Sequence, residues 1–286
     1  MNNFSYKLEK SHNPSMGLIV LQADQRIELD ARQQFEPEVN LHISRIPSAA
    51  TVTTETLKQM EKDLPIAVSL LPNAVDFDVV GYGCTSGTSV IGAENIAKIV
   101  KDRCKTKHVT EPVSALIAAC RHLGIERIGF LSPYVEAVSA GLRETLFLSG
   151  VETPIFGSFN EEIEERVVKI STVSISDAAV ELGRQDVDAI FLSCTNLNTL
   201  PVIKSIEEKI ANISRNNIFP EVPKEIKSKF KNLNFEFMTI HKSKGLGADA
   251  IIVLNLEAGK YGFPGYIEND PIMNLVRPGE QDFKNA

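Results

Sequence analysis

The chain has 286 residues, of which 43% are apolar, so it can bury the core of one large domain or two smaller ones. Its formal net charge of -7 gives no general electrostatic reason to bind nucleic acid or an anionic membrane. The four cysteines include no CxxC pair and the chain shows no apolar leader, which argues against a disulfide framework and predicts a cytoplasmic protein. No apolar run approaches the ~20 residues that span a bilayer, which argues against a membrane protein.

Short apolar runs alternate with amphipathic stretches over roughly the first 210 residues. Runs typical of buried strands lie at 17–21, 39–43, 77–83, 127–131 and 188–193. Apolar residues spaced three to four apart predict helices at 54–71, 90–103, 112–123, 135–150 and 175–184. This alternation favours a mostly parallel α/β sheet covered on both faces, and such sheets bind ligands beyond the carboxyl ends of their strands.

Two cysteines follow predicted strands in similar settings. Cys84 precedes Thr85 and Ser86, and Cys194 precedes Thr195 and Asn196, so we expect each cysteine to open a helix. The free N–H groups at a helix N-terminus stabilise a thiolate and bind carboxylates, which predicts thiols with a pKa near neutral. A lone cysteine after a buried strand is more commonly a small core residue. The hypothesis of a thiol on each side of a small acid therefore depends on the fact that the same setting occurs twice.

The other two cysteines, Cys104 and Cys120, lie in predicted helical patterns and are interpreted as structural. Alkylation should therefore label Cys84 or Cys194 faster than either of them. The histidines share no ligand spacing, so we expect no metal site.

The composition changes after residue 210. Residues 211–286 hold 10 basic and 9 acidic residues, so the acidic excess of the chain lies before them. We place a boundary there, between a first domain at 1–211 and a second at 212–286. The basic run from Lys224 to Lys231 is interpreted as a solvated face, and a strand is predicted from Ala250 to Leu256.

Residues 16–210 resemble the aspartate/glutamate racemase superfamily, within it the branch of maleate cis-trans isomerases and arylmalonate decarboxylases. The segments that carry this resemblance are Gly17–Asp24, Gly83–Thr88, Leu131–Tyr134, Ser158–Asn160 and Ser193–Leu197. The resemblance implies two flavodoxin-like lobes related by a pseudo-twofold axis, an active site between them, and no metal or organic cofactor.

The resemblance also implies roles for individual residues. Cys84 would attack an alkene carbon or remove a proton, and Cys194 would act on the opposite face. Asp24 stands where the isomerase branch usually has Asn, and it would repel a dicarboxylate unless it is protonated or faces away. The residues implied to hold carboxylates or complete the pocket are Thr85, Ser86, Thr195, Asn196, Tyr134 and Asn160.

Some of these residues have equally good structural interpretations. Tyr134 could be a packing residue, and Asn160 could cap a helix begun by the acidic run that follows it. That run, from Glu161 to Glu165, is interpreted as a solvated first helical turn.

Residues 212–286 resemble a fragment of the C-terminal lobe of UvrD/Rep-like superfamily I DNA helicases. The residues that match a motif contacting DNA and nucleotide in that family are Thr239, His241, Lys244 and Gly245. Gly247 stands where a nucleotide-binding Glu is usual, and the chain contains no G-x-x-x-x-G-K-[ST] phosphate loop. We therefore expect no helicase motor and no nucleic-acid partner.

Together these patterns predict a cofactor-independent, two-cysteine isomerase or racemase of a small carboxylic acid. The alternatives are a catalytically inactive fusion and a nucleic-acid-binding helicase remnant. The resemblance implies a closing strand and helix that the first domain lacks, and we expect the strand at Ala250–Leu256 to form a separate small unit instead of replacing them. The apolar surface left on the first domain would then favour a homo-oligomer.

Overall fold

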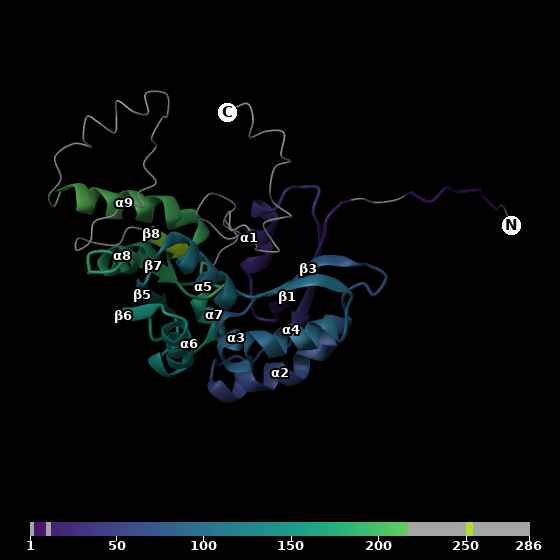
Figure 1. Ribbon diagram of the computed structural model, residues 1–286, viewed down its shortest axis with the longest axis horizontal. Coiled ribbons are helices and arrows are strands. Elements are labelled where there is room, and N and C mark those ends of the chain that lie inside the picture. Colours follow the sequence, from purple (N-terminus) through teal and green to yellow (C-terminus); the bar gives the residue numbers. More distant parts are fainter. Residues whose placement is uncertain (1–2, 10–12, 217–249, 254–286) are drawn as a thin grey trace, which may run out of the picture.

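The computed structural model describes residues 3–9, 13–216 and 250–253, which form two α/β lobes around parallel sheets (Figure 1). The strands of the first sheet, in the order β2-β1-β3-β4, are β1 (Ser15–Leu21), β2 (Asn40–Ile46), β3 (Phe77–Tyr82) and β4 (Thr106–Thr110). Those of the second, in the order β6-β5-β7-β8, are β5 (Arg127–Ser132), β6 (Glu152–Ser158), β7 (Ala189–Leu192) and β8 (Ala250–Val253). The two orders repeat one another, and the predicted two-lobed α/β fold is confirmed.

Helices cover both sheets. They are α1 (Ile27–Gln34), α2 (Thr54–Ser69), α3 (Thr85–Ile91), α4 (Ala93–Lys101), α5 (Pro112–Leu123), α6 (Glu136–Leu148), α7 (Glu164–Val167), α8 (Thr172–Leu182), the 3-10 turn η1 (Leu200–Val202) and α9 (Ile203–Asn216). The predicted helix at 90–103 is divided between α3 and α4 by Gly92, whose φ of 87° suits glycine. Of the other four predicted helices, the one at 112–123 has the predicted ends, and the remaining three are present with shifted ends.

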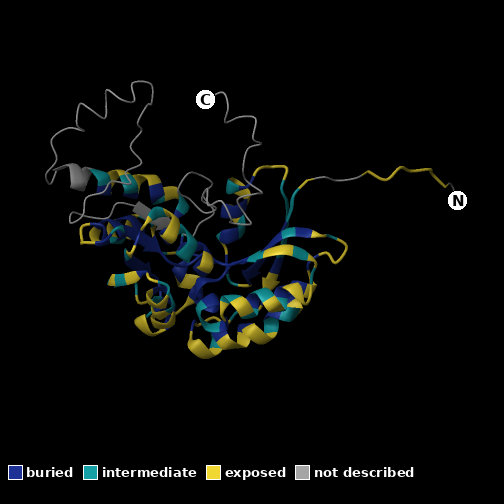
Figure 2. Cartoon of the chain, viewed as in Figure 1, coloured by how far each residue is buried: buried dark blue, intermediate teal, exposed yellow. Residues whose placement is uncertain are grey.

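The strand β1 shows why the first sheet is apolar on both faces. Met16 and Leu18 belong to the cluster that contains Ala31 of α1. Ile19, which points the opposite way in the strand, belongs to the cluster that contains Leu64 of α2. Figure 2 shows the buried residues along the sheets and at the junction of the lobes, with exposed residues on the outer helix faces. Each fully buried aliphatic side chain contributes about 1.5–3 kcal/mol of favourable transfer free energy.

The strand β8 is the fourth strand of the second sheet. It pairs in parallel with β7, with Ala250 opposite Ala189 and Val253 opposite Leu192. This position corresponds to that of β4 in the first lobe. The expectation that this strand forms a separate unit is therefore wrong, because the open edge of β7 offers it a ladder of backbone hydrogen bonds.

The domain boundary near residue 211 stays a prediction. The helicase-like motif, with Thr239, His241, Lys244 and Gly245, lies outside the described residues. Within the residues that are described, no helix is long and apolar enough to cross a bilayer.

Candidate active site

Cys84 lies directly beyond β3 and caps the N-terminus of α3, as predicted. Its backbone is extended, with φ -146° and ψ 112°, and its sulfur accepts a hydrogen bond from the Gly87 N–H at 3.2 Å. The Thr88 hydroxyl donates to the Cys84 carbonyl at 2.8 Å. Glycine is required at position 87, since a Cβ there would lie 2.4 Å from the Tyr82 hydroxyl and 3.0 Å from the Cys84 sulfur.

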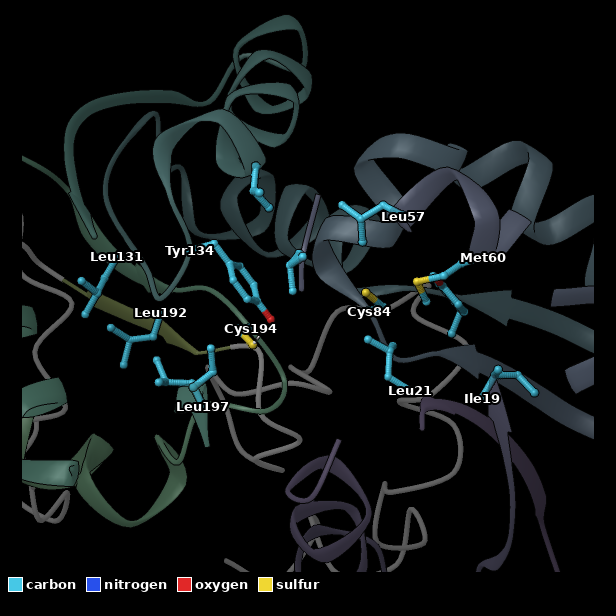
Figure 3. Close-up of a cluster of buried hydrophobic side chains, with 14 of the residues drawn as sticks. Ile19, Leu21, Leu57, Met60, Cys84, Leu131, Tyr134, Leu192, Cys194 and Leu197 are labelled. Atoms are coloured by element: carbon cyan, nitrogen blue, oxygen red, sulfur yellow. Dashed lines mark hydrogen bonds between the residues drawn. The ribbon is translucent and has the colours of Figure 1, made fainter. Parts of the chain in front are cut away.

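Cys194 lies beyond β7 but does not open a helix, so that expectation is wrong. Its φ of 99° places it in the left-handed region, and a turn follows it before η1 begins at Leu200. For a residue other than glycine this backbone costs about 1–3 kcal/mol. The Cys194 sulfur lies 3.1 Å from the Tyr134 hydroxyl at the junction of the lobes, where Cys84 also lies (Figure 3).

A buried carboxylate, Glu164, adjoins this cysteine. Glu164 is only 2% exposed, and its two oxygens accept hydrogen bonds from the Tyr134 hydroxyl and the Asn196 amide, each at 2.8 Å. The Asn196 carbonyl oxygen accepts from the backbone N–H of Gln25 at 2.9 Å, which joins the two lobes. Asn196 therefore orients Glu164 rather than standing free for a substrate.

The interpretation of Glu164 as part of a solvated turn is wrong. The segment that leads into α7 pairs with the first lobe, through an isolated bridge between Thr51 and Ile163 and a hydrogen bond from the Glu164 N–H to the Ala50 carbonyl at 3.1 Å. This pairing turns one glutamate of the acidic run into the site. The only local sign is Val167, a buried apolar residue three positions along the helix.

Asp24 is the second buried carboxylate, at 3% exposed. One of its oxygens accepts from the N–H groups of Arg26 and Ile27, both at 2.8 Å, and so fixes the start of α1. The other accepts from the Thr195 hydroxyl at 2.9 Å, and that hydroxyl also lies 3.2 Å from the Gly83 carbonyl. Asp24 thus faces the second lobe instead of turning away.

The remaining predicted residues differ in position. Thr85 and Ser86 are buried in the first turn of α3, and the Thr85 hydroxyl has no hydrogen-bond partner among the described residues. It is therefore free to meet a ligand. Asn160 is exposed, with a left-handed φ of 54°, and its N–H donates to the Ser158 hydroxyl at 2.8 Å. The structure does not bring Asn160 into the buried cluster, nor does Asn160 cap a helix, since α7 begins at Glu164.

Burial, with the two carboxylates, controls the acidity of the thiols. Burial raises the pKa of Cys84 to about 12; the Gly87 N–H opposes this, and the charges of Glu164 and Asp24 add to it. Burial, then Glu164, raises the pKa of Cys194 well above its ordinary value. The expectation of near-neutral thiols is wrong, because desolvation outweighs the helix N-terminus. Burial likewise raises the pKa values of Asp24 and Glu164.

The other two cysteines differ from their predicted settings in one respect. Cys120 is buried in α5, as expected for a structural residue. Cys104 lies in a bend after α4 and is only partly buried, so it is more accessible than Cys84 and Cys194. The expectation that it would react more slowly than they do is therefore not supported by exposure. Among the residues that the structure describes, no group of three acidic, histidine or cysteine side chains could hold a metal ion.

Comparisons with known proteins agree with this architecture. Residues 93–214 match the family model described as arylmalonate decarboxylase. The maleate isomerase of Geobacillus stearothermophilus is 24% identical over 213 residues, which cover 68% of this chain and 83% of that protein.

Solved structures resemble the chain in fold. A cysteine-to-serine variant of the maleate cis-trans isomerase from Nocardia farcinica, with a covalently bound succinylcysteine intermediate, superposes with a TM-score of 0.62. The two are 20% identical, over 69% of this chain and 85% of that one. The resemblance of this chain to maleate isomerases and arylmalonate decarboxylases is confirmed.

A second match concerns a shorter part of the chain. It is 32% identical over 81 residues to DNA helicase IV from Escherichia coli (strain K12). The matched region is 28% of this chain and 12% of that helicase, which is compatible with the predicted resemblance of part of the chain to a helicase fragment.

Proposed function

Since the chain resembles maleate isomerases and arylmalonate decarboxylases in sequence and fold, we propose that it is a cofactor-independent isomerase or racemase of a small carboxylic acid. The observation that carries this proposal is the pair of buried thiols, Cys84 and Cys194, beyond the third strands of two repeated sheets (Figure 3). Their common location at the junction of the lobes suits a small substrate held between them.

Two thiols allow chemistry on opposite faces of one carbon. In a racemisation, one thiolate removes a proton from the carbon next to the carboxylate, and the other thiol donates a proton to the opposite face. In a cis-trans isomerisation, a thiolate adds to the alkene, the resulting single bond rotates, and the thiolate leaves. The succinylcysteine in the related isomerase is an intermediate of the second kind.

The first turn of α3 would bind the substrate carboxylate. Thr85 supplies a buried hydroxyl without a partner among the described residues, and the buried Ser86 follows it. Thr195 and Asn196 are engaged with Asp24 and Glu164, so we assign them to holding these acids in place.

The two buried acids favour a racemase of an amino acid over an isomerase of a dicarboxylate. Burial, and after it the negative charge of Asp24, raises the pKa of Glu164, so the two carboxyls act on one another electrostatically. Maleate would bring two further negative charges to them, whereas the ammonium group of an amino acid would be attracted. Maleate is therefore the second candidate.

A substrate screen in deuterated water tests this proposal. The panel comprises maleate, aspartate, glutamate, hydantoins and arylmalonates, with the Cys84→Ala/Cys194→Ala double variant as control. We expect one amino acid to racemise with deuterium incorporated at the α-carbon. If no compound reacts, or if the double variant is as active as the parent chain, the proposal fails.

A further inference from the structure

Three buried side chains form a continuous hydrogen-bonded chain at the second cysteine. The Cys194 sulfur lies 3.1 Å from the Tyr134 hydroxyl, which donates to Glu164 Oε2 at 2.8 Å. The far oxygen of Glu164 accepts from Asn196 Nδ2. All four residues are at most 7% exposed. The Cys84 sulfur accepts from a backbone N–H and interacts with the Tyr82 hydroxyl, but among the described residues no carboxylate is hydrogen-bonded to that tyrosine.

The positions of the protons follow from the chemistry of these groups. While Glu164 is ionised its oxygens can only accept, so the single hydrogen of the Tyr134 hydroxyl goes to Glu164. The interaction between Cys194 and Tyr134 can then only be donated by the thiol, with the tyrosine oxygen as acceptor. Cys194 is thus a thiol while Glu164 is ionised, and the two states are coupled.

We propose that Glu164 is a positioning residue that takes the proton of Cys194 through Tyr134 and so makes the thiolate. The Cys194 S–H bond breaks as Tyr134 accepts that proton, and the original Tyr134 O–H bond breaks as its proton joins Glu164 Oε2. The products are a thiolate, a neutral tyrosine and a neutral carboxylic acid. Their total charge is the same as before the transfer. The use of the thiolate on a substrate carbon rests on the function proposed above.

The surrounding charges support this direction of transfer. Burial raises the pKa of Glu164, against its two hydrogen bonds, and Asp24 raises it further, so Glu164 is a stronger base than an exposed glutamate. The titratable groups that face the chain of three are Asp24 after β1 and Cys84 after β3. Tyr82 lies behind Cys84, and Arg45 of β2 faces Asp24.

The pH dependence of Cys194 alkylation tests the proposal without any turnover. Iodoacetamide is applied to the full chain, and labelling of Cys194 is followed by peptide mass spectrometry. The thiol with ionised Glu164 and the thiolate with protonated Glu164 hold equal numbers of protons, so their ratio does not change with pH. We therefore expect the alkylation rate of Cys194 to stay constant, at a plateau, between about pH 6 and 8. A thiol that releases its proton to solvent would instead lose about tenfold in alkylation rate for each unit by which the pH falls.

Two variants separate the relay from simple electrostatics. Glu164→Gln removes a negative charge, which by electrostatics alone would lower the pKa of Cys194 and speed labelling; the relay instead predicts slower labelling at pH 6 and a tenfold slope. Tyr134→Phe keeps the charge and breaks the middle link, so it should give the same slope. Glu165→Gln, at an exposed position of α7, is the matched control and should keep the plateau.

The proposal is overturned if the parent chain itself shows the tenfold slope, or if the plateau survives in Glu164→Gln. The first of these outcomes does not depend on whether any variant folds. A failed substrate screen with a clear plateau would refute the proposed function and leave the relay standing. An active enzyme without a plateau would do the reverse.

Discussion

The two cysteines occupy equivalent positions in two repeated lobes, yet their surroundings differ. Cys84 has an extended backbone at the start of a helix, and a backbone N–H reaches its sulfur. Cys194 has a left-handed backbone in a turn, and a tyrosine links it to a buried glutamate. A repeated topology therefore determines where a side chain lies, whereas its neighbours determine its proton chemistry.

This difference suggests unequal roles for the two thiols. A thiolate at Cys84 would be stabilised by the Gly87 N–H, with no carboxylate hydrogen-bonded to it. A thiolate at Cys194 would accept hydrogen bonds from the Tyr134 hydroxyl and the Asn196 backbone N–H, with the neutral Glu164 behind the tyrosine. A substitution that alters the surroundings of one thiol should therefore leave the surroundings of the other unchanged.

Apart from substitution of the two cysteines themselves, the largest effect is expected from Gly87→Ala. The new Cβ would meet the Tyr82 hydroxyl at 2.4 Å and the Cys84 sulfur at 3.0 Å, so the Cys84 half must shift. We expect turnover to fall on the order of 100-fold, as for a misplaced reacting group. Steady-state kinetics measure this. The control is Gly141→Ala in α6, where nothing lies within 4 Å of the new Cβ; equal losses in the two variants would refute the argument.

Removal of β8 should weaken the second lobe alone. A chain that ends at residue 216 lacks the ladder between β7 and β8, whose register covers Ala189 to Leu192. At about 1 kcal/mol for each net hydrogen bond, the loss is on the order of 2–3 kcal/mol. Hydrogen exchange in low concentrations of urea should show that the truncated chain has lower protection in β5 and β7 than in β1 and β3. Unchanged protection of β7 would mean that β8 does not stabilise this sheet.

The pH dependence of stability should reveal Glu164. Because the pKa of Glu164 is raised in the folded chain, its contribution is greatest below the unfolded value near 4.5 and is lost as the pH rises through the folded value. Glu164→Gln cannot ionise, so relative to the parent its stability should improve between pH 4 and pH 8, on the order of 1 kcal/mol per unit of pKa shift. Urea midpoints at several pH values measure this. If the parent chain instead became more stable relative to the variant as the pH rises from 4 to 8, the raised pKa of Glu164 would be contradicted.

The smallest effect is expected from Asn160→Gly, outside the buried cluster. Glycine adopts the φ of 54° without the penalty that a side chain incurs. Stability should change by less than about 1 kcal/mol, and turnover should be unchanged. A large loss of turnover would show that Asn160 does reach the substrate, as the family resemblance implies.

The parts of the fold with continuous apolar runs were predictable from the sequence. The strands β4 and β6 were not, because Thr106, Lys107 and His108 in β4 and Glu152 in β6 interrupt the apolar pattern in partly exposed strands. The cap at Cys84 follows from residues close to it in sequence. The left-handed backbone of Cys194 has no signal in the residues around it. The burial of Glu164 depends on the pairing of its segment with the first lobe, which a local sequence pattern does not reveal.

Two unlike thiols act on one substrate in the proposed mechanism, and single substitutions test this most directly. Turnover of the best substrate from the screen is measured for Cys84→Ala and Cys194→Ala, with Cys104→Ala as a control for loss of a cysteine outside the site. Because general acid-base catalysis contributes about 10²–10⁴-fold, each of the first two variants should lose activity by that order while the control keeps it. Activity at the parent level in either Cys84→Ala or Cys194→Ala would contradict the account.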